Sequence, residues 1–181
     1  MLKTIVNVYK IPLLLSITLA VTLIALRVER NSLTIAFIIL GSLLGTVILD
    51  LDYIIYAYFL EPNHDFSKTL KTFIHHKDYS NTLAFIHFHK NDLQDKILNS
   101  ALFQGVLAGA AIFVMASNTG FFIKALVLST FVNSIYRLIE EHLENRTETW
   151  FWALKTKPNK IMLYTYTAVL IGILLYCLST V

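Results

Sequence analysis

The stretch GSLLGTVILDLDYIIYAYFL, residues 41–60, is apolar enough to enter a lipid bilayer, yet it carries two carboxylates, Asp50 and Asp52. All its other residues are apolar, aromatic, glycine or hydroxyl-bearing. A transmembrane helix needs about 20 predominantly apolar residues to cross the hydrocarbon core. Because the apolar run extends back to Leu33, the sequence predicts a transmembrane helix over residues 33–60.

The composition of the whole chain is typical of an integral membrane protein. Of its 181 residues, 56% are hydrophobic and 15% are charged, whereas an ordinary soluble domain is about 25% charged. Four further apolar windows lie at about residues 6–27, 98–117, 120–140 and 160–179. We therefore predict an all-α, polytopic membrane helix bundle of about five transmembrane helices, in a single integral membrane domain over residues 1–181. A soluble helical bundle with a large core is the alternative.

The lysines and arginines are distributed asymmetrically about these predicted spans. Twelve of the 15 fall on one side, and Arg27, Arg30 and Lys124 fall on the other. Cytoplasmic loops of membrane proteins carry an excess of these residues. We therefore predict a multi-pass membrane protein with a cytoplasmic N-terminus and an external C-terminus. The charged run Arg27-Val28-Glu29-Arg30 favours an uncleaved anchor over a cleaved signal peptide for the first window.

The cytoplasmic face is expected to contact lipid. The net charge of +3 lies mostly on that side, where basic residues are attracted to anionic headgroups. The run Trp150-Phe151-Trp152, followed by Lys155 and Lys157, predicts an aromatic anchor at the membrane interface. We expect the lipid bilayer and its anionic headgroups as partners, and no nucleic acid. A membrane-protein partner or a homo-oligomer stays open.

Residues 61–97, between the second and third predicted spans, form a predicted cytoplasmic insert. Phe66, Leu70 and Ile74 recur at helical spacing and predict a short amphipathic helix. A second short helix is expected over about residues 80–89. The insert would therefore pack these helices against the cytoplasmic end of the bundle.

Asp50 and Asp52 need partners or a function. An aspartate at mid-bilayer costs about 2.5–3.5 kcal/mol on insertion scales. In a regular helix, with about 100° per residue, the two side chains point about 200° apart. They can reach one ligand only if the helix kinks between them; otherwise each has its own partner. Asp52 shares a helix face with Gly41 and Gly45, a small-x-x-x-small pattern that permits close helix approach.

Other polar residues are predicted at the same depth, in the cytoplasmic leaflet. The third span contributes Asn99, Ser100 and Gln104, and the fourth contributes Thr130, Asn133, Arg137, Glu140 and Glu141. The favoured interpretation is a hydrogen-bonded, ion-paired polar layer in which Arg137 neutralises an aspartate. A substrate or metal site with Asp50 and Asp52 as ligands is the second. Separate acids that reach towards the headgroups from a lipid-facing surface are the third.

Histidines are a further possible source of metal ligands, since neutral imidazoles bind zinc and other transition metals. Five of them follow the aspartates, at positions 64, 75, 76, 87 and 89, and a sixth is His142. On a helix, neither adjacent histidines nor His87 and His89 share a face. Solvated or interfacial histidines are therefore the favoured interpretation. His64, His87, His89 and His142 remain weak candidates.

Three segments, taken in chain order, resemble a known family. They are LLGTVILDLDY (43–53), DKILNSALFQG (95–105) and FVNSIYRLIEEHL (131–143). They are similar to the small bacterial inner-membrane proteins known as LexA-binding metal-dependent hydrolases, and to related membrane proteins of candidate bacterial phyla. Those proteins carry a P-D-x-D-H-like motif, a T-H-S-like motif that opens a span, and a histidine followed by an aspartate on another span. The resemblance covers about residues 35–145, and it implies a location in the bacterial inner (plasma) membrane.

Asp50 and Asp52 match the paired aspartates of the first motif, and this resemblance implies a metal-dependent hydrolase in which they bind the ion. The chain departs from the family pattern at Leu49 (proline), Tyr53 (histidine), Asn99 (histidine of the second motif), Asn133 (later histidine) and Arg137 (later aspartate). A guanidinium carries a fixed positive charge and a fork of donors. We therefore hypothesise that an internal ion pair has replaced the metal ion, and we expect no cofactor; a divalent metal ion is the alternative.

Three functions remain open from the sequence. The favoured one is a non-catalytic or degenerate relative of membrane metal-dependent hydrolases with a structural or partner-binding role. The second is an active metal-dependent hydrolase that acts on a lipid-like or membrane-proximal substrate. The third is a small transporter or channel subunit. The sequence therefore leaves open whether the protein is an enzyme.

Overall fold

The computed structural model describes residues 9–89, 93, 96–154 and 158–180, except for the side chains of Ser80 and His87. Every secondary-structure element in these residues is helical, which confirms the predicted all-α class. The elements are α2 (Lys10–Arg27), α3 (Ser32–Ile48), α4 (Leu51–Ile55), the π-helix η1 (Tyr56–Leu60), α5 (Asp65–His75), α6 (Tyr79–His89), α7 (Ala101–Ala116), α8 (Phe121–Leu143), α9 (Thr147–Trp150), the 3₁₀-helix η2 (Trp152–Leu154) and α10 (Lys160–Ser179).

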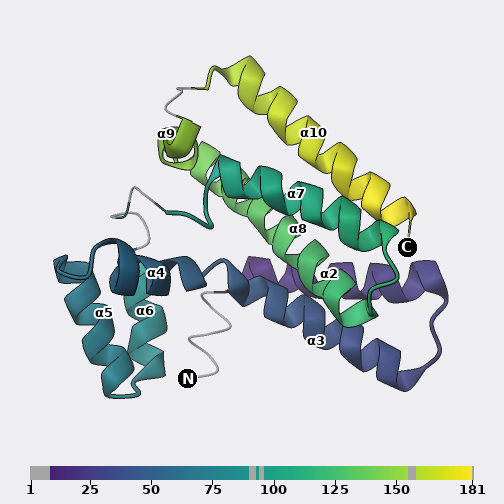
Figure 1. Ribbon diagram of the computed structural model, residues 1–181, viewed down its shortest axis with the longest axis horizontal. Helices are drawn as coiled ribbons and strands as arrows, with labels where there is room; N and C mark the ends of the chain where they lie inside the picture. Colours follow the sequence, from purple (N-terminus) through teal and green to yellow (C-terminus); the bar gives the residue numbers. More distant parts are fainter. Residues whose placement is uncertain (1–8, 90–92, 94–95, 155–157, 181) are drawn as a thin grey trace.

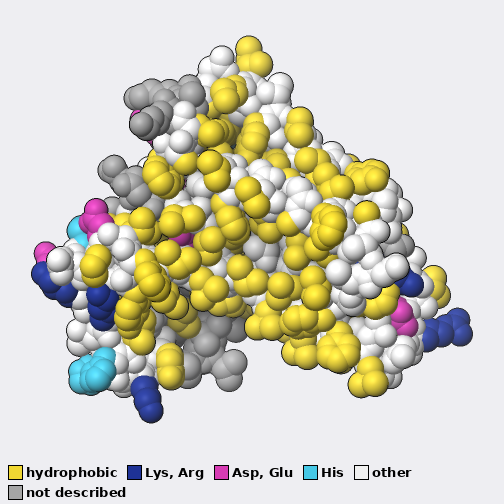
Figure 2. Space-filling model, in the orientation of Figure 1, with side chains coloured by type: hydrophobic (Ala, Val, Ile, Leu, Met, Phe, Trp, Pro, Cys, Tyr) yellow, Lys and Arg dark blue, Asp and Glu magenta, His cyan; other side chains and the backbone are white. Residues whose placement is uncertain are grey.

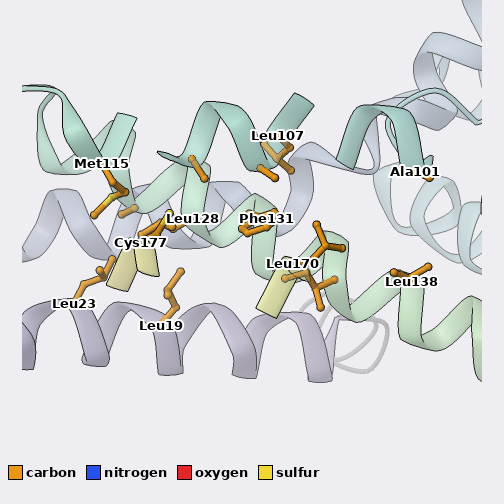
Figure 3. Packing of buried hydrophobic residues seen from close by; sticks show 14 of the residues in the cluster. Leu19, Leu23, Ala101, Leu107, Met115, Leu128, Phe131, Leu138, Leu170 and Cys177 are labelled. Carbon is orange, nitrogen blue, oxygen red and sulfur yellow. The ribbon is translucent and has the colours of Figure 1, made fainter. Parts of the chain in front are cut away.

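Helix α8 is the centre of the bundle, and α2, α3, α7 and α10 pack against it (Figure 1). Its buried apolar side chains include Ala125, Leu128, Ile135 and Leu138, which recur at helical spacing. They join side chains of α2, α7 and α10 in one hydrophobic cluster (Figure 3). The apolar stripe of α8 therefore holds the longer helices together.

Three helices, α2, α8 and α10, are long and apolar enough to cross a membrane. A fourth span results if α3 is counted together with α4 and η1, although the pair is bent by 44°. The third predicted span, at about residues 98–117, corresponds to α7, which is apolar but has 16 residues. Figure 2 shows hydrophobic side chains over the middle of one face and most of the visible charged side chains at its two ends.

The small-x-x-x-small pattern of α3 lies against α8. A Cβ atom at Gly45 would stand 2.7 Å from the carbonyl oxygen of Leu126 and from the Cβ of Ser129, and one at Gly41 would collide with the carbonyl oxygen of Phe122. These separations are far below van der Waals contact. The two glycines therefore let the backbones of α3 and α8 approach closely, as the sequence predicted.

The second predicted span breaks at the aspartates. Helix α3 ends at Ile48, α4 begins at Leu51, and the bend between them is 44°. Around the break the amide of Asp50 donates to the carbonyl of Val47 and the amide of Tyr53 donates to the carbonyl of Asp50, which are i→i−3 bonds of the 3₁₀ type. The helix thus has the kink that one of the two predicted arrangements requires.

The two short helices of the insert are present as predicted. Helices α5 and α6 form a hairpin beside α4 and η1 (Figure 1). Phe66 and Leu70 of α5 are buried together with Tyr53, Tyr56 and Ile86 in a second hydrophobic cluster. The insert is therefore packed onto the second part of the broken span, α4 and η1.

The predicted aromatic anchor is wrong for two of its three residues. Trp150 and Phe151 are each 1% exposed and belong to the main hydrophobic cluster. The indole of Trp152 donates to the carbonyl of Lys96 over 2.8 Å. The run Trp150–Trp152 is therefore directed into the protein, because α9 and η2 fold back onto α7 and α8.

Candidate functional site

Asp50 lies at the break and forms an ion pair with Arg137 of α8. The Nη2 atom of Arg137 is 2.5 Å from Oδ1 of Asp50. The hydroxyl of Tyr9, the residue before α2, donates to Oδ2 of the same carboxylate. The side chains of Arg137 and Asp50 are 15% and 12% exposed. Three helical segments that are far apart in the sequence therefore meet at one carboxylate.

Asp52 faces a different segment, the one that leads into α7. It is fully buried, and its Oδ1 accepts a hydrogen bond of 2.9 Å from the amide of Ile97. Its Oδ2 accepts from the amide of Asn99 at 2.9 Å and from the Nδ2 of Asn99 at 2.8 Å. Backbone and side-chain donors thus satisfy this carboxylate, which holds the beginning of α7 against α4.

Asn99 connects the two aspartates through Arg137. Its Oδ1 accepts from Nη1 of Arg137 at 2.9 Å, while its Nδ2 also donates to the carbonyl of Leu49 at 3.0 Å. We call Tyr9, Asp50, Asp52, Asn99 and Arg137 the ion-pair cluster. All four carboxylate oxygens of the cluster accept hydrogen bonds from the protein. The two acids have separate partners, yet one continuous network joins them.

Glu141 forms a second ion pair, one turn further along α8. Its Oε1 lies 3.2 Å from Nζ of Lys96, and its Oε2 lies 3.2 Å from Nη2 of Arg146. Lys96 and Glu141 are 4% and 7% exposed. Burial lowers the pKa of Lys96, and the nearby Glu141 carboxylate opposes that shift. Glu141 therefore belongs to the polar layer, where it is paired with Lys96 and Arg146.

Two residues predicted for the same layer lie elsewhere. Asn133 donates from Nδ2 to the hydroxyl of Ser16 at 2.9 Å, in a group of hydroxyls between α2, α3 and α8 that includes Thr46 and Ser129. Gln104 accepts from the indole of Trp150 at 3.2 Å. The prediction that both join the aspartates is wrong, because each side chain finds a partner on the helix that it faces.

The histidine candidates do not gather at the aspartates in the described residues. His64 caps α5 by accepting from the amide of Phe66 at 3.3 Å, and His89 bonds to the carbonyl of Phe85 at 3.0 Å. His142 lies edge-on to Tyr164, with 5.9 Å between ring centres. The side chain of His87 lies outside the described set. In this part of the chain no group of three histidine, cysteine, aspartate or glutamate side chains could hold a metal ion.

The metal ion that the resemblance implies does not fit the donors at this site. A cation approaching Asp50 would meet the guanidinium of Arg137, which is hydrogen-bonded to both Asp50 and Asn99. The cation and the guanidinium carry like charges, so they would repel each other strongly in a site with little water. The chemistry of the cluster is therefore that of an internal salt bridge.

A cavity of about 90 Å³ lies beside the ion-pair cluster. Its walls come from the beginning of α2, the break between α3 and α4, α6, α8 and α9, and from the segment before α7. The charged residues Asp50, Arg137, Lys96, Glu140 and Glu141 line it. Both ion pairs therefore open onto one polar space.

Sequence reasoning did not identify Tyr9, Lys96 and Ser16 as members of these networks. Two carry a signal in the sequence: Tyr9 is a polar aromatic residue near the beginning of the first predicted span, and Ser16 is a polar residue within that apolar span. Lys96 stands three residues before Asn99, and the sequence indicates its charge but no partner. The partner of each residue depends on which helices pack together, and the sequence pattern does not specify that.

Comparison of the chain with protein-family models, with curated proteins and with solved structures finds no match in any of the three.

Proposed function

We propose that this chain is a five-span protein of the bacterial inner membrane in which the ion-pair cluster locks the helices together without catalysis. In this proposal it is a degenerate relative of membrane metal-dependent hydrolases and acts through assembly or partner binding. The observation that carries the proposal is the pairing of Arg137 with Asp50 and, through Asn99, with Asp52. The guanidinium stands in the structural role of the lost metal ion.

The five-span topology rests on the charge pattern and on α7. At 1.5 Å per residue, the 16 residues of α7 measure about 24 Å, a little less than the hydrocarbon core of about 30 Å. The turn at residues 117–120 joins its end to the beginning of α8, so the two helices form a hairpin. Counting α7 and the bent pair as spans leaves Arg27, Arg30 and Lys124 on the outside, with the N-terminus inside.

A structural role follows from how the carboxylates are occupied. Removing one partner of a buried ion pair typically costs about 3–5 kcal/mol, because the other charge is left uncompensated. Asp50 and Arg137 join α2, the broken span and α8 at one point. A cluster of this kind orients helices and prevents them from sliding past one another.

Replacing Arg137 tests the lock. We expect Arg137→Met to lower the free energy of unfolding by about 3–5 kcal/mol, because Asp50 keeps its charge and loses its cation. Thermal unfolding of the detergent-solubilised protein measures the effect. Arg30→Met is the matched control, since Arg30 is exposed between α2 and α3. An Arg137→Met protein as heat-resistant as the parent would remove the basis of the proposal.

Metal analysis separates this proposal from an active hydrolase. We expect the purified parent to hold no stoichiometric divalent metal, and we expect Arg137→Asp to gain affinity for it, because the cation is removed and a second carboxylate is placed beside Asp50. Elemental analysis and calorimetry measure both. Metal that is stoichiometric in the parent and lost in an Asp50→Asn, Asp52→Asn double variant would overturn the proposal in favour of the active hydrolase.

A further inference from the structure

The cavity beside the ion-pair cluster has the features of a binding site. The two ion pairs form part of its wall, and apolar side chains of α2 and α6 complete it, Pro12, Leu83 and Ile86 among them. Its volume of about 90 Å³ exceeds the 10–15 Å³ or so that a single water molecule requires. The remaining exposure of Arg137 and Asp50 shows that the space reaches the charged groups.

The hydroxyl of Tyr53 adds a neutral polar group to the wall of the cavity. Tyr53 lines the cavity and is 4% exposed. Its hydroxyl lies within the electrostatic influence of Arg137, Asp50 and Glu141. A polar ligand in the cavity would accept a hydrogen bond from this hydroxyl.

The charges on the wall favour a ligand that carries both signs. Three carboxylates (Asp50, Glu140 and Glu141) and two cations (Lys96 and Arg137) line the space. A simple anion would face the three carboxylates, and a simple cation would face the guanidinium and the ammonium. A group with a phosphate and an ammonium a few bonds apart can place each charge against its opposite.

We propose that this cavity binds a phosphoethanolamine group, with the phosphate towards Arg137 and Tyr53 and the ammonium towards the glutamates of α8. The inference rests on the proposed function, because it uses the intact ion pairs and the topology that puts the inner end of α8 at the headgroup level. The membrane source of this group is phosphatidylethanolamine, and the soluble source is free phosphoethanolamine. The site would therefore bind one lipid headgroup, or its soluble equivalent, between α2, α6 and α8.

Native mass spectrometry of the full chain in detergent tests the proposal. The protein is titrated with phosphatidylethanolamine, phosphatidylglycerol and phosphatidylcholine of identical acyl chains, and separately with free phosphoethanolamine. We expect one equivalent of phosphatidylethanolamine to bind at least tenfold more tightly than the other two lipids. Equally tight binding of free phosphoethanolamine would support the same chemistry and identify a soluble source. Equal binding of all three lipids would overturn the proposal.

A conservative substitution places the ligand in the cavity. Tyr53→Phe removes one hydroxyl and keeps the ring in its hydrophobic cluster, so we expect phosphatidylethanolamine to bind about tenfold more weakly, as for the loss of a hydrogen bond to a charged group. Tyr176→Phe is the matched control, since Tyr176 lies exposed near the far end of α10. Unchanged binding in Tyr53→Phe would overturn the location of the site.

The two proposals can fail separately. If Arg137→Met is as stable as the parent, the structural lock is wrong, whatever lipid is bound. If Arg137→Met is destabilised but the parent does not discriminate between the lipids, the lock stands and the headgroup site is wrong.

Discussion

At the scale of single residues, Arg137 matters for the geometry of its guanidinium as well as for its charge. Nη2 donates to Asp50 and Nη1 donates to Asn99, which in turn donates to Asp52. A lysine ammonium is a compact point charge and lacks this planar fork of donors. The residue therefore connects two acids that point in different directions from one broken helix.

Asn99 is the member of the cluster whose replacement best isolates its hydrogen bonds. We expect Asn99→Leu to lower the free energy of unfolding by about 2–3 kcal/mol, because Nη1 of Arg137 loses its acceptor and Asp52 loses a side-chain donor while remaining buried. Chemical or thermal unfolding in detergent measures the loss. The control is Asn118→Leu, in the exposed turn before α8, which should change stability little. Equal losses of stability in the two variants would contradict the role of Asn99 in connecting Arg137 with Asp52.

At the scale of elements, the broken span α3–α4–η1 positions the site. The break at Asp50 directs one carboxylate towards α8 and the other towards the segment before α7. Before the break, Gly41 and Gly45 bring α3 against α8. After it, the π-helix η1, in which the amide of Glu61 donates to the carbonyl of Tyr56, leads into the insert. Close packing on one side and irregular backbone on the other hold the acids in place.

The glycines of α3 and α7 form a matched pair for testing this packing. We expect Gly45→Ala to destabilise the protein by about 1–3 kcal/mol, because the new methyl group overlaps the backbone of α8. Gly109→Ala meets nothing within 4 Å and should be neutral or should gain up to about 1 kcal/mol from helix propensity. Thermal unfolding of both variants measures the difference. A Gly45→Ala protein as stable as Gly109→Ala would contradict the close approach of α3 and α8.

At the scale of the whole molecule, two separate hydrophobic clusters stabilise different parts of the chain. The larger cluster joins α2, α7, α8 and α10, and the smaller one joins the α5–α6 hairpin to α4 and η1. The ion-pair cluster connects α4 and the segment before α7 to α2 and α8. The hairpin is thereby attached to the bundle through the broken span, at the same end as the polar cavity.

The proposed topology can be tested with single cysteines. In a Cys177→Ala background we expect a membrane-impermeant maleimide added to intact spheroplasts to label Asn118→Cys and Thr180→Cys. We expect Lys68→Cys, on α5, to be labelled only after permeabilisation, because the insert is cytoplasmic in this topology. Mass spectrometry of the purified protein measures the labelling. Opposite accessibility of positions 118 and 180 would exclude the five-span arrangement, since two spans separate them.

Much of the local structure could be predicted from hydrophobic periodicity. The all-helical class, helices α5 and α6, and the close-packed face of Gly41 and Gly45 all follow from patterns within one segment. The Arg137–Asp50 pair could also be predicted, because a buried charge needs a counter-charge and only a few lay at that depth. The partners of Gln104 and Asn133 could not be predicted in this way, because they depend on how each helix is rotated about its axis.

The sequence by itself determined that the chain is helical and strongly apolar, and that its few buried acids need a cation. The tertiary structure decided which donors satisfy each acid, that the span bends by 44° at Asp50, and that Trp150 and Phe151 lie inside the protein. The physical reason is that hydrophobic periodicity specifies only which face of a helix is buried. The neighbour that this face meets depends on how all the helices pack, and only the folded chain establishes that packing.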